Sequence, residues 1–115
     1  MTHTTKQKIF IKALSVNKLY TGKRKKTELY KAYEWDLWLK LENLEDFEDT
    51  HNQLKLNIEV GLSNPRADLD NTCKAFQDIL QKKYHFDDCQ IYRLIMKKVD
   101  VKKGKEYIKF TLDKI

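Results

Sequence analysis

The chain has few residues that interrupt or cross-link a fold: its 115 residues include one proline, three glycines and two cysteines. Cys73 and Cys89 match no zinc-binding spacing and offer no disulfide framework, so we expect two small apolar residues in a reduced protein. No apolar run approaches the roughly 18 residues that span a bilayer. Residues 1–8 (MTHTTKQK) also lack the apolar segment of a signal peptide. These absences predict a soluble, cytoplasmic protein.

Positive charge is what the chain has in excess. It contains 23 lysines and arginines against 17 acidic residues, which gives a formal net charge of +6. This balance favours polyanionic partners, either nucleic acid or an anionic membrane surface. The length fits one domain over residues 1–115, so binding and any catalysis must share a single hydrophobic core.

The first half of the chain predicts a strand, a loop, a helix and a second strand. Apolar residues alternate over 9–13, and the polar segment 15–26 is typical of an exposed loop. Thr27 can cap a helix that ends near Asn43. The clearest strand is 54–62, where apolar and polar residues alternate strictly. We expect the helix to bury a stripe of Leu29, Ala32, Tyr33, Leu37 and Leu41.

The second half predicts another helix and two strands. The helix covers 69–82, and its apolar stripe is Leu69, Cys73, Phe76 and Leu80. Two strands at 89–101 and 107–112 flank a glycine-containing turn, which suggests a hairpin. The predicted fold is therefore a small α+β domain with a mixed β-sheet and two main helices in the order β-α-β-α-β-β.

An acidic cluster accompanies the second helix. Asp68 and Asp70 stand at its start, and Lys74 lies one turn further on the same face. The helix carries the chain about 20 Å away, and 83–88, if extended straight along the helix, spans roughly the same distance back. Asp88 would then join the first two carboxylates. Three such ligands favour magnesium or manganese, and Lys74 would stabilise charge during phosphodiester cleavage.

A plainer interpretation explains each residue separately. Asp68 can be a helix cap, Asp70 and Lys74 an ordinary ion pair, and the two aspartates at 87–88 part of a turn. The basic run at 23–26 can equally be a solvated loop or a phosphate contact. From the residues alone, both interpretations stay open.

Three segments and one lysine resemble the signature of the RusA family of Holliday junction resolvases. Residues 66–71 (RADLDN), then Lys74, then 87–90 (DDCQ) match its pattern R-x-D-x-D-N, a lysine and D-D-x-Q, and 15–20 (SVNKLY) is similar to its loop after the first strand. The resemblance implies a homodimeric, magnesium-dependent endonuclease, and manganese stays possible from the carboxylate ligands. It further implies that four-way DNA junctions are resolved by paired symmetric nicks.

By position, the resemblance assigns catalysis to Asp68, Asp70, Asp88 and Lys74, and metal binding to the three aspartates. The residues expected to contact DNA are Asn17, Lys23, Arg24, Lys25, Lys26, Arg66 and Asn71. A branched-DNA-binding protein that does not cleave, or a fork or flap nuclease of the same fold, is the alternative.

The first helix carries more bulky apolar residues than one sheet face can bury. Trp35, Trp38 and Leu39 lie outside its expected stripe. Because unburied apolar residues of this size mark interaction surfaces, we expect this helix to contribute to an isologous contact between two copies.

Overall fold

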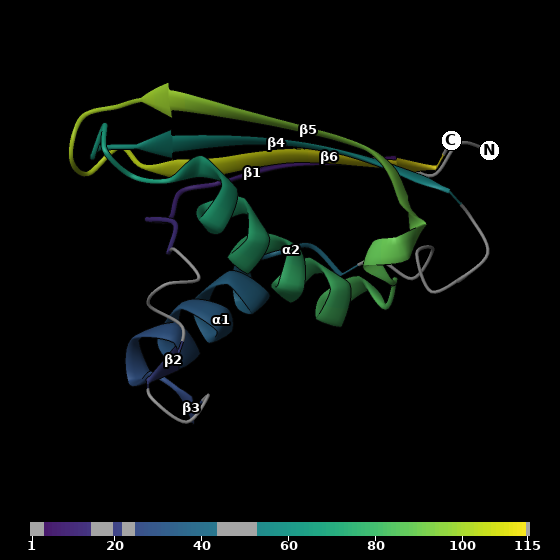
Figure 1. The fold of residues 1–115 in the computed structure, drawn as a ribbon, viewed down its shortest axis with the longest axis horizontal. Helices are drawn as coiled ribbons and strands as arrows, with labels where there is room; N and C mark the ends of the chain where they lie inside the picture. Colours follow the sequence, from purple (N-terminus) through teal and green to yellow (C-terminus); the bar gives the residue numbers. More distant parts are fainter. Residues whose placement is uncertain (1–3, 15–19, 22–24, 44–52, 115) are drawn as a thin grey trace.

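The computed structural model describes residues 4–14, 20–21, 25–43 and 53–114. Four strands form one mixed sheet in the order β1 (Thr4–Ile9), β6 (Tyr107–Lys114), β4 (Leu54–Leu62) and β5 (Ile91–Asp100). Helices α1 (Glu28–Lys40) and α2 (Leu69–Tyr84) lie on one face of this sheet (Figure 1). The predicted α+β fold and its order of main elements are confirmed. No helix in the described ranges is long and apolar enough to cross a membrane.

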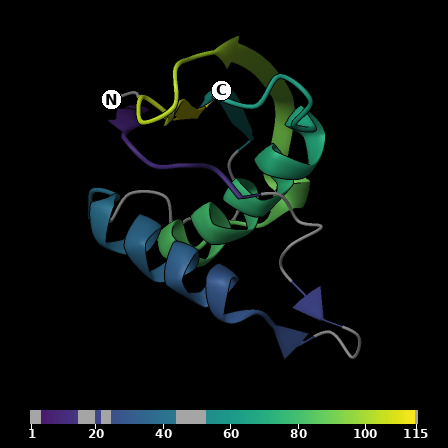
Figure 2. The same cartoon turned by 90° about the vertical axis from the view of Figure 1, so that its left-hand side faces the viewer.

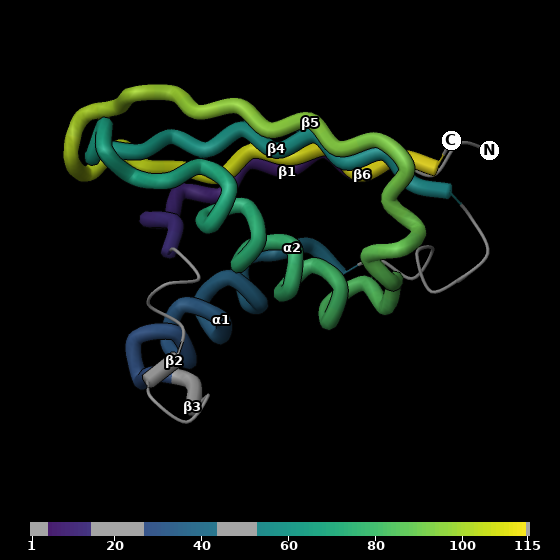
Figure 3. Tube along the Cα trace, viewed as in Figure 1, coloured from purple at the N-terminus to yellow at the C-terminus, as the bar shows by residue number. Residues whose placement is uncertain are grey.

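Strand β4 forms as predicted and organises the core. Its alternate residues Leu54, Leu56, Ile58 and Val60 are buried, as the period of two requires. It pairs with β6 antiparallel and with β5 parallel. Helix α2 makes the crossover that a parallel pair needs, so it runs back along the sheet from the end of β4 to the start of β5 (Figure 3).

The predicted hairpin of the last two strands is wrong. Strands β5 and β6 are separated by β4 in the sheet. The connection at 101–106 passes the end of β4, where the Val101 N–H donates to the Leu62 carbonyl at 3.0 Å, and Gly104 adopts a φ of 91°. A short glycine-containing turn between two strands indicates a reversal, but it does not say whether a third strand lies between them.

Strand β1 begins and ends earlier than the predicted 9–13. Two of its inward residues, Thr5 and Gln7, are polar, which hides the alternation in the sequence. Gln7 is fully bonded: its Nε2 donates to Thr5 Oγ1 and Tyr84 Oη, both at 2.9 Å, and its Oε1 accepts from the Glu42 N–H at 3.0 Å. Because every buried polar atom of the Gln7 amide has a partner, the strand tolerates it in the core.

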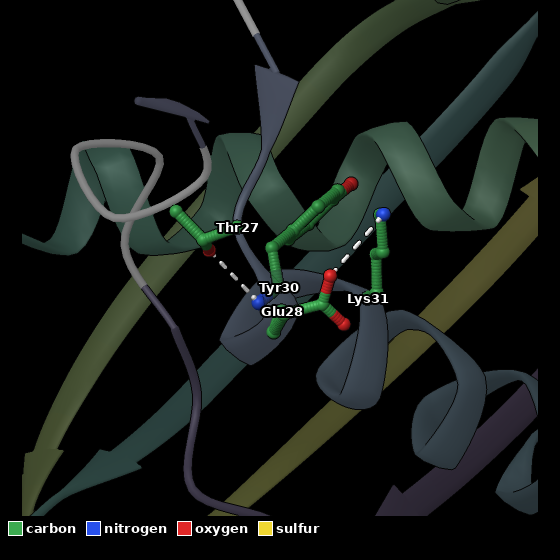
Figure 4. Close-up of polar contacts among 4 residues, drawn as sticks. All are labelled: Thr27, Glu28, Tyr30 and Lys31. Atoms are coloured by element: carbon green, nitrogen blue, oxygen red, sulfur yellow. Dashed lines mark hydrogen bonds and ion pairs between the residues drawn. The ribbon is translucent and has the colours of Figure 1, made fainter. Parts of the chain in front are cut away.

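Helix α1 begins as predicted. The Thr27 side chain accepts from the Tyr30 N–H at 3.1 Å, and Lys31 pairs with Glu28 in the first turn (Figure 4). The loop before it contains a pair of two-residue strands, β2 (Tyr20–Thr21) and β3 (Lys25–Lys26).

The buried face of α1 differs from the predicted stripe. Tyr33, Leu37 and Leu41 of the predicted stripe are buried, but Leu29 is 57% exposed, Ala32 is exposed, and the buried residue of the first turn is Tyr30. Apolar residues occur on several sides of this helix, so spacing alone could not select the face. Trp35 and Leu39 are each 64% exposed, so the predicted excess of apolar surface on α1 is present.

Candidate active site

Asp68 is the N-cap of α2. Its Oδ1 accepts from the Asp70 N–H at 3.0 Å, and its Oδ2 accepts from Asn71 Nδ2 at 2.9 Å. The Thr72 hydroxyl donates to the Asp68 carbonyl at 2.8 Å. The carboxylate is exposed, and each oxygen keeps a further lone pair for another ligand. Asp68 can therefore cap the helix and bind a cation at the same time.

Asp70 and Lys74 share the exposed side of α2. In the described part of the chain no ion pair joins them, so the ordinary ion pair of the plainer interpretation is not formed. Beneath them Cys73 is buried, and burial, with a smaller effect from the Asp70 carboxylate, raises the pKa of its thiol to about 12. Cys73 therefore stays a neutral core residue, and the chemistry available here is that of the carboxylates and the lysine.

Lys98 is a site residue that the sequence analysis missed. From β5, its Nζ donates to the carbonyls of Pro65 and Ala67, the latter at 3.0 Å. These carbonyls belong to the loop that precedes Asp68, so the lysine fixes the entry to α2. Arg66, on the same loop, is exposed. The sequence did contain one indication of this role. Lys98 lies two residues after Met96, and therefore on the side of β5 that faces the helices.

The chain leaves α2 abruptly. His85 adopts the left-handed conformation, with φ 54° and ψ 50°, and Phe86 turns into the core. Asp87 then caps the short 3₁₀ helix Asp88–Gln90. The Asp87 N–H donates to Gln90 Oε1 at 2.8 Å. The Cys89 N–H donates to the Asp87 carboxylate at 3.3 Å, and this hydrogen bond lowers the pKa of Asp87. The D-D-x-Q motif thus contains a capping box and leaves the Asp88 side chain exposed.

The predicted return of Asp88 to the other carboxylates is wrong within one chain. The Asp88 N–H donates to Gln81 Oε1 at 3.1 Å, which places it beside the last turns of α2. Asp70 lies in the first turn, and the helix between Asp70 and Gln81 is about 16 Å long at 1.5 Å per residue. In the described ranges, no group of three or more Asp, Glu, His or Cys residues is arranged to hold a metal ion.

The sheet topology explains this separation. Residues Leu54 and Ile91, which begin the parallel strands β4 and β5, lie side by side. Because α2 connects the end of β4 to the start of β5, its two ends lie at opposite ends of the sheet (Figure 3). One chain therefore offers a site with two carboxylates, Asp68 and Asp70, with Lys74 beside them.

The predicted DNA contacts are only partly described. Asn17, Lys23 and Arg24 lie outside the described residues, and only the backbone of Lys25 and Lys26, in β3, is described. The remaining two predicted contacts, at 66 and 71, flank Asp68. All seven remain predictions.

Two substitutions of Asp68 should separate its role in folding from its role in chemistry. Asp68→Asn keeps a good N-cap, whereas Asp68→Ala loses it and should lower the free energy of unfolding by about 1 kcal/mol. Both remove the negative charge, so both should lose cleavage. Urea unfolding of the two variants measures the first effect, and nicking of labelled DNA measures the second. An asparagine variant that cleaves at the parental rate would limit Asp68 to capping.

The comparisons with known proteins concern the chain as a whole. Residues 6–111 match the family described as endodeoxyribonuclease RusA. This span contains the acidic residues Asp68, Asp70 and Asp88 and the lysines Lys74 and Lys98. No curated protein matches the chain significantly. Since the family match covers almost the whole chain, the chain belongs to the RusA family of endodeoxyribonucleases.

Proposed function

We propose that this nuclease resolves four-way DNA junctions by paired, metal-dependent nicks. The observation that supports the proposal is the exposed pair Asp68 and Asp70 at the start of α2, with Lys74 one turn away, in a chain of a DNA endonuclease family. The proposal includes the predicted phosphate contacts of Arg66 and of the basic run at 23–26.

The residues present fit a hard divalent cation. Magnesium is usually held by one or two carboxylates together with waters and substrate phosphate oxygens, and Asp68 and Asp70 supply this ligand set; manganese accepts the same ligands. When bound, the ion would acidify the attacking water and neutralise charge on the phosphate. Asn71 orients the Asp68 carboxylate through its hydrogen bond. Lys74 would bind a phosphate oxygen and stabilise the charge that develops there.

Asp88 enters this proposal through a second copy of the chain. Strand β5 is an edge strand in which Tyr92, Leu94 and Ile95 are exposed by 66%, 40% and 47%. An edge of this kind is a template for pairing with another strand. Antiparallel pairing of two β5 strands would set the start of one beside the end of the other.

This pairing would complete the carboxylate cluster. The end of β5 carries Lys98, which holds the loop before Asp68, and the start of β5 follows the 3₁₀ helix that begins at Asp88. Asp88 of the second copy would therefore approach Asp68 and Asp70 of the first, and the two-fold axis would produce two such sites. Two equivalent sites suit a junction that has its own two-fold symmetry.

The exposed apolar residues of α1 offer a different contact. The end of α1 lies beside β1, since Lys40 Nζ donates to the Phe10 carbonyl at 3.4 Å and the Glu42 N–H bonds Gln7. Strand β1 is the edge of the sheet opposite β5. In the view of Figure 2, α1 likewise runs along the side away from β5. A dimer through α1 would leave Asp88 far from Asp68, so we favour β5.

Cleavage of labelled DNA tests the function. The parental protein is incubated with a four-way junction, a replication fork and a linear duplex, each with magnesium, with manganese and with chelator. We expect symmetric nicks in the junction with either metal and none with chelator. Equal or faster cutting of the fork would favour the fork or flap nuclease. Tight junction binding without cutting under any condition would favour the protein that only binds.

A further inference from the structure

The face of the sheet that points away from the helices is strongly basic. The strand registers align twelve residues of this face in three rows across all four strands. Two of the twelve, Glu59 and Asp113, are acidic. Six are cationic: Lys6, Lys8, Lys55, Arg93, Lys97 and Lys109. We call this surface the open face, because in the described ranges both helices lie on the other side (Figure 1). The open face therefore carries a net charge of +4, which is most of the formal net charge of +6 of the chain.

The row that crosses the strands at Glu59 shows how little of this charge is neutralised within the chain. Its four positions are Lys8, Lys109, Glu59 and Lys97. The Tyr107 hydroxyl donates to Glu59 Oε2 at 2.7 Å, and Lys97 Nζ lies 3.9 Å from Glu59 Oε1. The hydrogen bond from Tyr107 is the main reason that the pKa of Glu59 is lowered, and the nearby lysines add to it. One carboxylate thus faces three ammonium groups.

Protection of sheet edges explains only part of the pattern. Charged residues on edge strands discourage sheets from pairing edge to edge, which accounts for the charges on β1 but not for those on β5, the edge that we propose to pair. Lys55 and Lys109 are on the inner strands β4 and β6, which have no free edge. Lys109 is also directly opposite Lys8, and like charges in that position destabilise a sheet. These two inner lysines therefore need another explanation.

The shape of the open face suits an extended ligand that is recognised by its charge along its length. A partly open hollow of about 190 Å³ lies on it, and its lining combines the polar residues Asn57, Glu59, Lys97, Lys109 and Thr111 with the apolar residues Ile58, Ile95 and Phe110. Around this small hollow, the surface offers positive charge and hydrogen-bond donors. Phosphate groups along a nucleic-acid backbone match it, because their contacts are electrostatic and independent of sequence.

We propose that the open face is a second DNA-binding surface, which holds the phosphate backbone of a duplex segment on the side of the sheet opposite Asp68 and Asp70. The proposal rests on the nuclease function in that DNA is already the substrate. It would let one molecule contact two segments of a branched DNA at once, one through the carboxylate site and one through the open face.

The test compares two double variants that lose the same charge. In the first, Lys55→Gln and Lys109→Gln neutralise the inner lysines of the open face. In the second, Lys31→Gln and Lys40→Gln neutralise two lysines of α1 that form exposed ion pairs with Glu28 and Asp36. Binding to a linear duplex and to a four-way junction is measured in chelator, so that no DNA is cut, over a series of salt concentrations. Circular dichroism confirms that both variants are folded.

We expect the slope of log affinity against log salt to fall by about 1 to 2 for the open-face variant, since each lost phosphate contact removes about 0.9. The α1 variant should keep the parental slope. Equal slopes for parent and open-face variant, or equal losses in both variants, would overturn the proposal. So would lysine-dependent binding to phosphatidylserine vesicles with an unchanged DNA slope, which would make this face a membrane-binding surface. A parental protein that fails to cut junctions but shows the expected slopes would contradict the proposed function and leave this inference standing.

Discussion

Asp70→Asn should bind a four-way junction as tightly as the parent and cut it at least about a hundredfold more slowly, a loss of roughly 2.7 kcal/mol of transition-state stabilisation. The Asp70 side chain is exposed in the first turn of α2, so its change to asparagine leaves the core intact. It removes a charge that a hard divalent cation requires. Single-turnover cleavage with magnesium measures the rate, and gel-shift binding in chelator measures the affinity.

The matched control is Asp36→Asn on α1. Its carboxylate also lies on an exposed helix surface, where it pairs with Lys40 at 3.2 Å, and an exposed pair of this kind contributes little to stability. This variant should cut at the parental rate. Parental cleavage by Asp70→Asn would refute the assignment of the metal site, whereas equal losses in both variants would point to a general effect of charge on DNA binding.

Two inactive variants should restore activity to each other. Asp70→Asn and Asp88→Asn, refolded together, form mixed dimers in which one site pairs the intact Asp70 of one chain with the intact Asp88 of the other. Random assortment makes half of the dimers mixed, so about a quarter of all sites should be intact. Each mixed dimer has one working site, so its product should be a junction with a single nick. Strand-specific labels detect this product directly.

Failure of complementation would contradict a site shared between chains. A matched pair of surface variants then identifies the contact: Leu94→Lys on β5 should prevent association and cleavage, whereas Leu39→Lys on α1 should not. Light scattering should give about twice the chain mass of 13.8 kDa for the parent and the Leu39 variant. The opposite pattern would identify α1 as the interface, as the sequence suggested.

Local sequence patterns predicted the elements whose alternation or capping residues match their burial and hydrogen bonds in the fold. The alternation in β4 matches its burial from Leu54 to Val60, and Thr27 begins α1 as its capping chemistry predicts. The first strand was misplaced because its inward positions include Gln7, whose partners Tyr84 and Glu42 are distant in sequence. A buried polar residue can be recognised only when its hydrogen-bond partners are known.

The site residues show the same difference between local and long-range information. Asp68, Asp70 and Lys74 lie within two turns of one helix, so spacing alone placed them correctly. The position of Asp88 depends on the direction in which β5 pairs with β4, a property that no local spacing contains. Lys98 was missed for the same reason, because the loop that it holds contacts β5 only in the folded sheet.

The separation of Asp88 from Asp70 along α2 has a consequence for how the cleavage rate depends on the concentration of this nuclease. If the cluster is completed only by a second copy, then at concentrations below the dimer dissociation constant the rate of nicking rises with the square of the chain concentration. A few newly made molecules would leave chromosomal DNA intact, and cutting would begin only after the protein had accumulated. The length of one helix would thus set a concentration threshold for DNA cleavage.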